Sequence, residues 1–113
     1  MSQNIRVGEL WLVDLVDVLG HEQGGTRPVL VLAVHSQTDL FMVTPCTGNM
    51  DAQRFPYTHK ITASASNGLS RDSVAMVFQT RCLSKTRFKH KLGDLEKKPL
   101  DAIKILLGTF CGI

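Results

Sequence analysis

The chain has 113 residues, and its size, composition and charge are those of one ordinary globular domain. Hydrophobic residues make up 43% and charged residues 20%, which argues against a disordered or collagen-like chain. The formal net charge of +3 permits a nucleic-acid partner but does not require one. We therefore expect a single domain over residues 1–113.

The cysteines and the apolar runs bear on the compartment in which the protein works. Cys46, Cys82 and Cys111 are odd in number and form no CxxC pair, which argues against a disulfide framework or a zinc ribbon. The N-terminus lacks the apolar stretch of a signal peptide, and no run approaches the roughly 18 apolar residues of a membrane helix. The sequence thus predicts a cytoplasmic protein with free thiols and no membrane-spanning segment.

The first half of the chain predicts β-strands joined by a glycine-rich loop. Residues 9–16 alternate in part between polar and apolar, with Trp11 and Val13 on one face. Residues 27–34 form a nearly continuous β-branched and leucine run, which is typical of a central strand buried on both faces. Between these two strands, the glycines of residues 17–26 predict a loop longer than a tight hairpin.

The second half of the chain predicts more strands and then a helix. Strands are expected at residues 40–46, 57–62 and 73–78, and a short strand near residues 79–83 continues the last of them. After Pro99 the leucines and isoleucines recur at helical spacing. Five or six short strands followed by one helix predict a mainly β fold, a small barrel or sandwich whose open side the helix covers.

One predicted loop is unusual because it gathers groups that can do chemistry. His21, Glu22 and Arg27 lie close together in the glycine-rich connection between the first two strands. Functional groups concentrate on loops held by rigid strands. A solvated hairpin with an incidental carboxylate and arginine would have the same composition, and composition alone favours that second interpretation.

A longer motif around this loop favours a functional loop over a solvated hairpin. The strings GELWLVDL at residues 8–15 and GHEQGGTRPVLVL at residues 20–32 resemble the N-terminal signature of the MazF/PemK toxin family. The strings VTPCT at residues 43–47, GLSRDSVA at residues 68–75 and QTR at residues 79–81 fit later parts of the family pattern. The resemblance therefore spans nearly the whole chain, and the EQxGxRP core of the loop is specific to the family.

The resemblance implies a small SH3-like β-barrel with a C-terminal helix, of the MazF/PemK/CcdB type and usually a homodimer. It also implies the toxin of a type II toxin–antitoxin system, an endoribonuclease that cuts single-stranded RNA, mRNA above all, at specific sequences. Cleavage would leave 2′,3′-cyclic phosphate and 5′-hydroxyl ends, and no metal or other cofactor is expected. The expected protein partner is a MazE/PemI-like antitoxin, whose acidic and initially disordered tail suits a mildly basic surface.

The residues of the motif can supply this chemistry. RNA carries its own nucleophile, the 2′-hydroxyl, so the reaction needs a base, donors that stabilise the phosphorane and a proton for the leaving 5′ oxygen. Arg27 is the expected phosphate clamp, and Thr47 can donate a hydroxyl hydrogen bond to the same phosphate. Glu22 is the preferred base because a carboxylate near an arginine stays ionised. His21 is its rival because an imidazole titrates near neutrality.

Two further groups of residues are candidates for RNA binding. Arg54 and Phe55 combine a cation with a ring, which suits stacked single-stranded bases as well as an ordinary β-loop. The basic stretch after Gln79 could follow the RNA backbone or be a solvated loop. The RNA-binding set that we expect comprises Gln23, Arg54, Phe55, Gln79, Arg81, Lys85 and Arg87.

One position departs from the family pattern. Many relatives have an acidic residue directly before the glutamine of the QxR motif, and in some of them it is assigned a catalytic role. Here that residue is Phe78, so a carboxylate base from this strand is absent and the role shifts toward Glu22 or His21. Phe78 either stacks an RNA base or faces the core, and the alternation of residues 73–78 favours the core.

Two other functions stay open from the sequence. CcdB-type toxins share the fold but bind DNA gyrase and carry no nuclease chemistry. They depend on a C-terminal Trp-Gly-Ile motif, of which the ending GTFCGI keeps only Gly-Ile. A catalytically impaired relative would bind RNA or an antitoxin without cutting, and Phe78 is the residue that keeps this alternative open.

Overall fold

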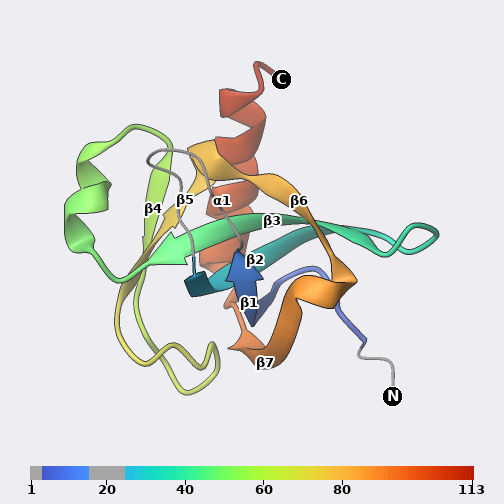
Figure 1. Cartoon of the computed structure of the whole chain (residues 1–113). Helices are drawn as coiled ribbons and strands as arrows, with labels where there is room; N and C mark the ends of the chain where they lie inside the picture. The colour runs from blue at the N-terminus through green and yellow to red at the C-terminus, as the bar shows by residue number, and fades with distance from the viewer. Residues whose placement is uncertain (1–3, 16–24) are drawn as a thin grey trace.

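The computed structural model describes residues 4–15 and 25–113, and it consists of curved antiparallel strands with a C-terminal helix behind them (Figure 1). The strands are β1 (Glu9–Leu15), β2 (Gly25–His35), β3 (Leu40–Thr47), β4 (Thr58–Ile61), β5 (Ser73–Met76), β6 (Arg81–Ser84) and β7 (Phe88–Asp94). The helix is α1 (Lys97–Phe110), and the 3-10 turns are η1 (Met50–Arg54), η2 (Val77–Gln79) and η3 (Lys85–Arg87). The prediction of a mainly β fold with a C-terminal helix is confirmed.

β3 is the strand that joins the two parts of the sheet. Along the sheet the strands follow the order β4-β5-β3-β2-β1-β7, and β6 also pairs with β3. The first half of β3 pairs with β6, from Leu40 opposite Ser84 to Val43 opposite Arg81. Its end pairs with β5, where Thr47 lies opposite Val74. The end of β3 therefore lies where the two parts of the sheet diverge.

The β1–β2–β3 sheet is buried on both faces, because alternate residues of each strand enter different cores. One cluster lies inside the barrel, where Phe88 of β7 packs against both Trp11 and Phe41 at ring-centroid distances of 5.7 and 5.1 Å. This cluster comprises Ile5, Trp11, Val13, Leu15, Val29, Val31, Phe41, Val43, Leu83 and Phe88. The other lies between the sheet and α1 and includes Leu10, Leu30, Cys46, Ile61, Ala75 and Ile103. The prediction of a doubly buried central strand is confirmed for β2.

The structure corrects the predicted elements in three places. No strand was expected at residues 88–94, which were interpreted as either a path for the RNA backbone or a solvated loop, but they form β7, which pairs with β1 through two register shifts. The strand expected at residues 73–78 ends at Met76, because residues 77–79 turn into η2. The loop expected at residues 47–56 contains η1, whose first turn Asn49 caps by accepting a hydrogen bond from the Asp51 amide at 3.1 Å.

The loop between β4 and β5 is fixed by one buried amide. The side-chain oxygen of Asn67 accepts hydrogen bonds from the amides of Ser64 and Leu69 at 3.0 and 3.1 Å. Its Nδ2 donates to the carbonyl of Thr62 at 2.9 Å and to Glu96 Oε1, just before α1, at 3.2 Å. Because Asn67 is fully buried and satisfied, it ties the loop to the start of α1 and fixes where the residues after it emerge.

Trp11 lies in the barrel core, and its indole N–H has a hydrogen-bond partner, as is usual for a buried tryptophan. The indole donates a 2.9 Å hydrogen bond to Glu9 Oε1, which also accepts from the Arg6 amide at 2.9 Å. Glu9 Oε2 lies 3.1 Å from Lys91 Nζ. Burial alone would raise the pKa of the Glu9 carboxyl, but the hydrogen bonds from Trp11, Arg6 and Lys91 outweigh it and hold the pKa below its ordinary value.

The lowered pKa of Glu9 predicts a loss of stability in acid. The folded state favours the ionised carboxylate, so its contribution is complete above the unfolded pKa of about 4.3 and declines as the pH falls through the lower folded value. Urea titrations between pH 7 and pH 3 should show this decline, and Glu9→Gln should reduce it because glutamine does not titrate. An unchanged acid dependence in Glu9→Gln would show that other carboxyls account for it.

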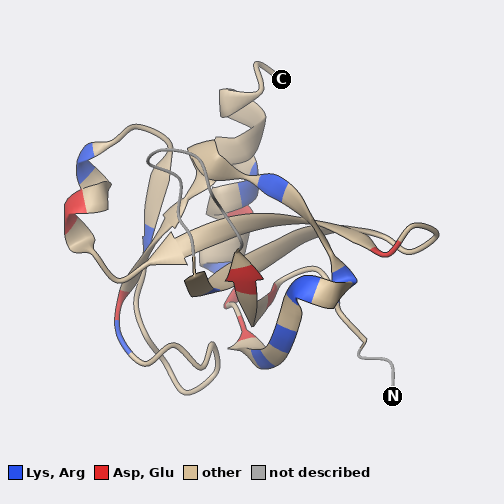
Figure 2. Ribbon diagram, in the orientation of Figure 1, with Lys and Arg blue, Asp and Glu red and all other residues tan. Residues whose placement is uncertain are grey.

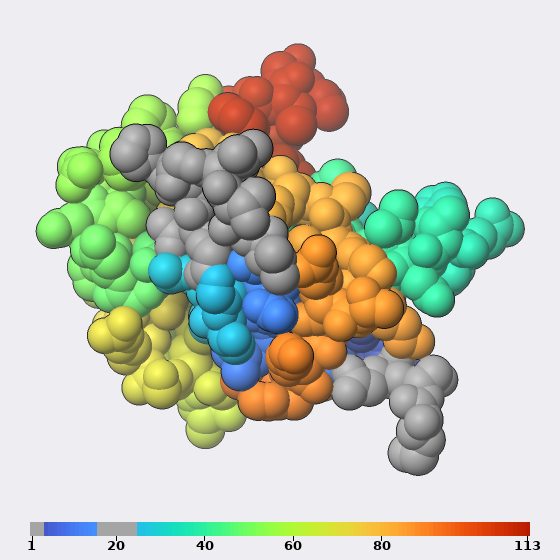
Figure 3. Space-filling model, in the orientation of Figure 1, coloured from blue at the N-terminus to red at the C-terminus, as the bar shows by residue number. Residues whose placement is uncertain are grey.

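The start of β2 lies on an open face of the molecule. In Figure 3 it (cyan) has the green and yellow segments of η1 and the β4–β5 loop on one side and the blue segment of β1 on the other, with the orange segment of β7 beyond β1. Figure 2 shows Lys and Arg side by side along η3 and β7. Within residues 4–15 and 25–113, no helix has the length and apolar character needed to cross a membrane.

Candidate functional site

The residues predicted to do chemistry fall partly inside and partly outside the described chain. His21, Glu22 and Gln23 belong to residues 16–24, outside the described residues, so their predicted roles stay predictions. Arg27 is the third residue of β2 and is half-buried. The structure therefore locates the expected phosphate clamp but neither of the two candidate bases.

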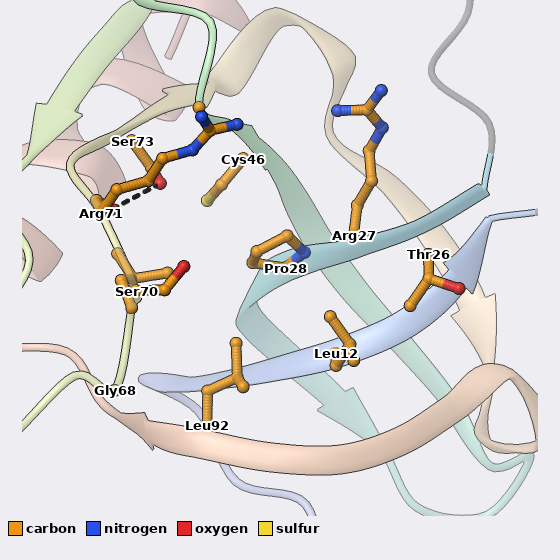
Figure 4. Close-up of a pocket in the computed structure, with 12 residues that line it drawn as sticks. Leu12, Thr26, Arg27, Pro28, Cys46, Gly68, Ser70, Arg71, Ser73 and Leu92 are labelled. Atoms are coloured by element: carbon orange, nitrogen blue, oxygen red, sulfur yellow. Dashed lines mark hydrogen bonds between the residues drawn. The ribbon is translucent and has the colours of Figure 1, made fainter.

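Arg27 lines a surface pocket of about 320 Å³ at the start of β2, which we call the arginine pocket. Figure 4 shows its guanidinium on one side of the pocket and that of Arg71 on the other, with the Cys46 thiol on the Arg71 side. The other lining residues are Leu12, Thr26, Pro28, Gly48, Gly68, Leu69, Ser70, Ser73 and Leu92. Of the described residues that line this pocket none is acidic, so two cations and several hydroxyls surround a space suited to an anion.

Arg71 is a residue of this pocket that the sequence analysis did not identify. It lies in the loop before β5, where its carbonyl accepts a 3.2 Å hydrogen bond from Ser73 Oγ. The available signal was the segment GLSRDSVA at residues 68–75, but in the family pattern that it resembles, roughly G-L-x-x-D-S-x-[AV], Arg71 falls at an unspecified position. The sequence therefore offered no reason to choose it over the other surface arginines.

Thr47, the expected hydroxyl donor, lies at the end of β3 and is 7% exposed. Its Oγ1 accepts a 3.1 Å hydrogen bond from the Asn49 amide, which leaves the hydroxyl proton available to donate. Gly48 lines the arginine pocket, whereas Thr47 and Asn49 line a second pocket. Arg27 and Thr47 thus line two adjacent pockets, which residues 47–49 separate. That both side chains bind the same phosphate stays a prediction.

The second pocket, of about 430 Å³, is lined by aromatic and polar side chains, and we call it the aromatic pocket. The rings of Phe55 and Phe78 lie 5.9 Å apart between centroids, and the Arg54 guanidinium lies 4.6 Å from the centroid of Phe55. The full lining comprises Thr47, Asn49, Asp51, Ala52, Arg54, Phe55, Met76, Phe78 and Gln79. Three of the predicted RNA-binding residues, Arg54, Phe55 and Gln79, are therefore brought together beside Thr47.

Phe78 differs from the interpretation that the alternation of residues 73–78 favoured. Because the strand ends at Met76 and η2 follows, the alternation does not continue to Phe78. The ring is partly buried, packs against the small cluster of Ala52, Val74 and Met76, and also lines the aromatic pocket. One side of the ring therefore packs against this small cluster, and the other side forms part of the wall of the aromatic pocket.

The remaining predicted RNA-binding residues lie elsewhere. Arg81 begins β6 and pairs with Val43 in the first half of β3. Lys85 and Arg87 belong to η3, and the Lys85 amide donates a 3.0 Å hydrogen bond to the carbonyl of Asp39, next to the start of β3. None of the three lines the arginine pocket or the aromatic pocket.

The cysteines predict a simple labelling pattern. Cys46 is fully buried beneath the arginine pocket, and burial raises the pKa of its thiol to about 12. Cys82 and Cys111 are exposed. A thiol reagent should modify two cysteines promptly in the native protein and the third only on unfolding, because the thiolate is the reactive form. Three equally fast thiols would contradict the burial of Cys46, and Cys46→Ser should remove only the slow one.

The described residues hold no group of three or more His, Cys, Asp or Glu placed to bind a metal ion. The side chains that line the two pockets include guanidiniums, hydroxyls, amides and rings. Such groups bind phosphates and nucleobases.

Comparison with known proteins gives a consistent result. Residues 6–110 match the family model of the PemK-like, MazF-like toxin of type II toxin–antitoxin system. The chain is 35% identical to endoribonuclease MazF of Staphylococcus saprophyticus subsp. saprophyticus over 111 residues, 92% of each chain. The chain belongs to the PemK-like, MazF-like toxins of type II toxin–antitoxin systems. The family resemblance inferred from the sequence is confirmed.

Solved structures of this toxin family share the fold. A crystal structure of MazF from Deinococcus radiodurans superimposes with a TM-score of 0.84 at 27% identity, covering 99% of this chain and all of the other. A MazE–MazF crystal structure from the same organism gives a TM-score of 0.75 at 27% identity over 99% of both chains. These comparisons lend no support to the alternative of a CcdB-type gyrase poison.

Proposed function

We propose that this MazF-like toxin is an endoribonuclease that cuts single-stranded RNA, mRNA above all, at short specific sequences. The observation that carries the proposal is the 35% identity to the S. saprophyticus endoribonuclease MazF over 92% of both chains. The arginine pocket supports it, because the described residues that line it present guanidiniums and hydroxyls without a carboxylate. Such a pocket suits the phosphodiester backbone of a nucleic acid.

In the proposed reaction the 2′-hydroxyl attacks the adjacent phosphorus and the bond to the 5′ oxygen breaks. A base takes the 2′ proton, and the leaving 5′ oxygen gains a proton, so the products are a 2′,3′-cyclic phosphate and a 5′-hydroxyl. Arg27 stabilises the charge that builds on the phosphorane, and the Thr47 hydroxyl donates to it from the end of β3. Glu22 and His21 are the candidate bases, and both lie outside the described residues.

The aromatic pocket is proposed to hold an RNA base next to the cleaved phosphate. Phe55 and Phe78 offer ring faces for stacking, and Gln79 and Asn49 offer amide groups for the edges of the base. Only an unpaired base can enter, because pairing hides these edges and keeps the base in a helix. This pocket thereby supports the preference for single-stranded RNA.

Arg81, Lys85 and Arg87 are proposed to attract the RNA backbone at longer range. They belong to β6 and η3, and none of them lines either pocket. Together with the Lys and Arg residues of β7 they form one basic segment (Figure 2). Their contribution would be an affinity that falls as salt rises, without sequence choice.

Several further properties follow from membership of a toxin–antitoxin family and are part of the proposal. Residues 1–113 act as one toxin domain in the cytoplasm, where mRNA is found. The protein forms a homodimer, and a MazE/PemI-like antitoxin inhibits it by covering the basic surface with an acidic tail. The D. radiodurans MazE–MazF structure is a relative in which two such proteins are found together.

The proposal is tested by incubating the purified protein with a long single-stranded RNA in EDTA and mapping the fragment ends. Discrete cuts that leave cyclic-phosphate and 5′-hydroxyl ends are expected, and they would also identify the recognised motif. RNA binding without cleavage by the folded protein would instead support the catalytically impaired alternative. Binding to gyrase without any effect on RNA would support the CcdB-type alternative.

A further inference from the structure

We propose that Arg71 is a second phosphate-binding residue, which holds the RNA backbone phosphate next to the one held by Arg27. This inference rests on the proposed function, because it takes RNA as the ligand of the arginine pocket. It assigns a role to a residue that the family motif leaves unspecified. The two guanidiniums on opposite sides of the pocket are the observation that carries it (Figure 4).

Hydrogen bonds of the neighbouring residues hold the Arg71 backbone in place. On one side the Ser73 hydroxyl donates to the Arg71 carbonyl at 3.2 Å. The adjacent Asp72 accepts a 2.8 Å hydrogen bond from the Ala63 amide and lies 3.8 Å from Lys60 Nζ. Asp72 is thus engaged with β4 and the segment after it, and it is not among the residues that line the pocket. The loop therefore presents the arginine at the pocket while its neighbouring carboxylate faces another part of the fold.

The Arg71 guanidinium itself lies against the end of β3. A Cβ built on Gly48 would lie 2.2 Å from Arg71 Nε, 2.4 Å from Nη2 and 2.5 Å from Cζ. The guanidinium therefore lies directly against the backbone of Gly48, a close approach that any other residue would block. Because Gly48 follows Thr47, the Arg71 guanidinium contacts the backbone one residue away from the proposed hydroxyl donor of the reaction.

The size and charge of the pocket also fit two phosphates. Its volume of about 320 Å³ lies at the low end of the range of ligand pockets, about 300–1,000 Å³. That space exceeds what one phosphate group needs and can take two successive phosphates with the ribose that joins them. Two arginines on opposite sides of such a pocket can therefore hold two successive phosphates of one strand. An arginine fork is suited to each because it matches the oxygens of a phosphate.

The test measures binding of an RNA that carries a 2′-deoxyribose at the mapped cleavage position, by fluorescence anisotropy over a range of salt concentrations. Arg71→Gln should weaken binding about 10- to 100-fold, as expected for a lost hydrogen bond to a charged group. The slope of log Kd against log salt should fall by about 0.7, the value for one phosphate contact on a single strand. Lys98→Gln, an exposed charge on α1, is the control for the loss of one positive charge.

A second variant separates phosphate binding from any role in folding. Gly48→Ala keeps Arg71 but pushes its guanidinium away, and the fold should tolerate the change because only the end of a flexible side chain must move. It should weaken binding in the same direction, and the double variant should lose little more than Arg71→Gln alone. Circular dichroism and thermal unfolding would show that each variant is folded.

The possible outcomes distinguish this inference from the proposed function. If the wild type cuts RNA and Arg71→Gln binds with the affinity and salt slope of Lys98→Gln, the inference is wrong and the proposed function stands. If the wild type binds an unmodified single-stranded RNA without cutting it, that RNA itself serves as the probe; the predicted loss in Arg71→Gln would then support the inference while the nuclease proposal is wrong. If the wild type neither binds nor cuts RNA, both are wrong.

Discussion

Replacing Arg27 with alanine should lower the rate of RNA cleavage by about 100- to 1,000-fold, the usual cost of removing one donor that stabilises a charged transition state. The reason is that the phosphorane carries more negative charge than the substrate, so the guanidinium contributes most when the phosphorus is attacked. The rate is measured under single-turnover conditions with an RNA that contains the mapped cleavage motif. Because Arg27 is half-buried at the start of β2, unfolding in urea should be measured alongside.

Arg27→Lys is the matched control for this prediction. Lysine keeps the charge but loses the planar fork that matches two phosphate oxygens, so its rate should lie between those of the wild type and Arg27→Ala. Full activity in a folded Arg27→Ala protein would contradict the role of Arg27 as the phosphate clamp. It would also remove the reason for placing the cleaved phosphate in the arginine pocket.

The largest expected effect on stability comes from Gly68→Ala. Gly68 has φ +71°, and a Cβ there would lie 1.9 Å from the carbonyl oxygen of Leu92 in β7. A left-handed backbone costs an L-residue about 1–2 kcal/mol, and forced overpacking typically adds about 1–3 kcal/mol. We therefore expect the free energy of unfolding to fall by about 2–5 kcal/mol, measured by urea titration.

Gly112→Ala separates the two causes of this loss. Gly112 has φ +78°, and no atom lies within 4 Å of a Cβ built there, so only the backbone cost applies. Gly68→Ala should lose clearly more stability than Gly112→Ala. Equal losses would show that the close approach of residue 68 to β7 does not matter. Because Gly68 also lines the arginine pocket, the same variant should reduce RNA binding.

Much of the fold could be predicted because its strands follow simple patterns. The continuous apolar run of β2 predicted a strand buried on both faces, and the residues after Pro99 predicted the helix. β7 was missed because lysines and a histidine follow its buried Phe88, and two register shifts against β1 interrupt any regular alternation. A charged strand on the outside of a barrel resembles a solvated loop when only its sequence is considered.

The candidate site could be predicted only in part, because its residues meet through tertiary structure. The family motif led to Arg27 and Thr47, and the mixture of cation and ring led to Arg54 and Phe55. That Thr47, Phe55 and Gln79 line one pocket depends on β3 pairing with β5 and on the turns η1 and η2. Likewise Arg71 lies against Gly48 although 23 positions separate them in the chain, so no local pattern indicated it.

The most direct test of the proposed mechanism is cleavage of an RNA with a single 2′-deoxyribose at the mapped cut site. The 2′-hydroxyl is the proposed nucleophile, so this RNA should bind with nearly the affinity of the all-ribose strand but stay uncut at that position. The unmodified strand in the same reaction should be cut in EDTA, and the cut should be slowed by about 100- to 1,000-fold in Arg27→Ala. Cleavage of the deoxy-substituted RNA at the same bond would contradict attack by the 2′-hydroxyl.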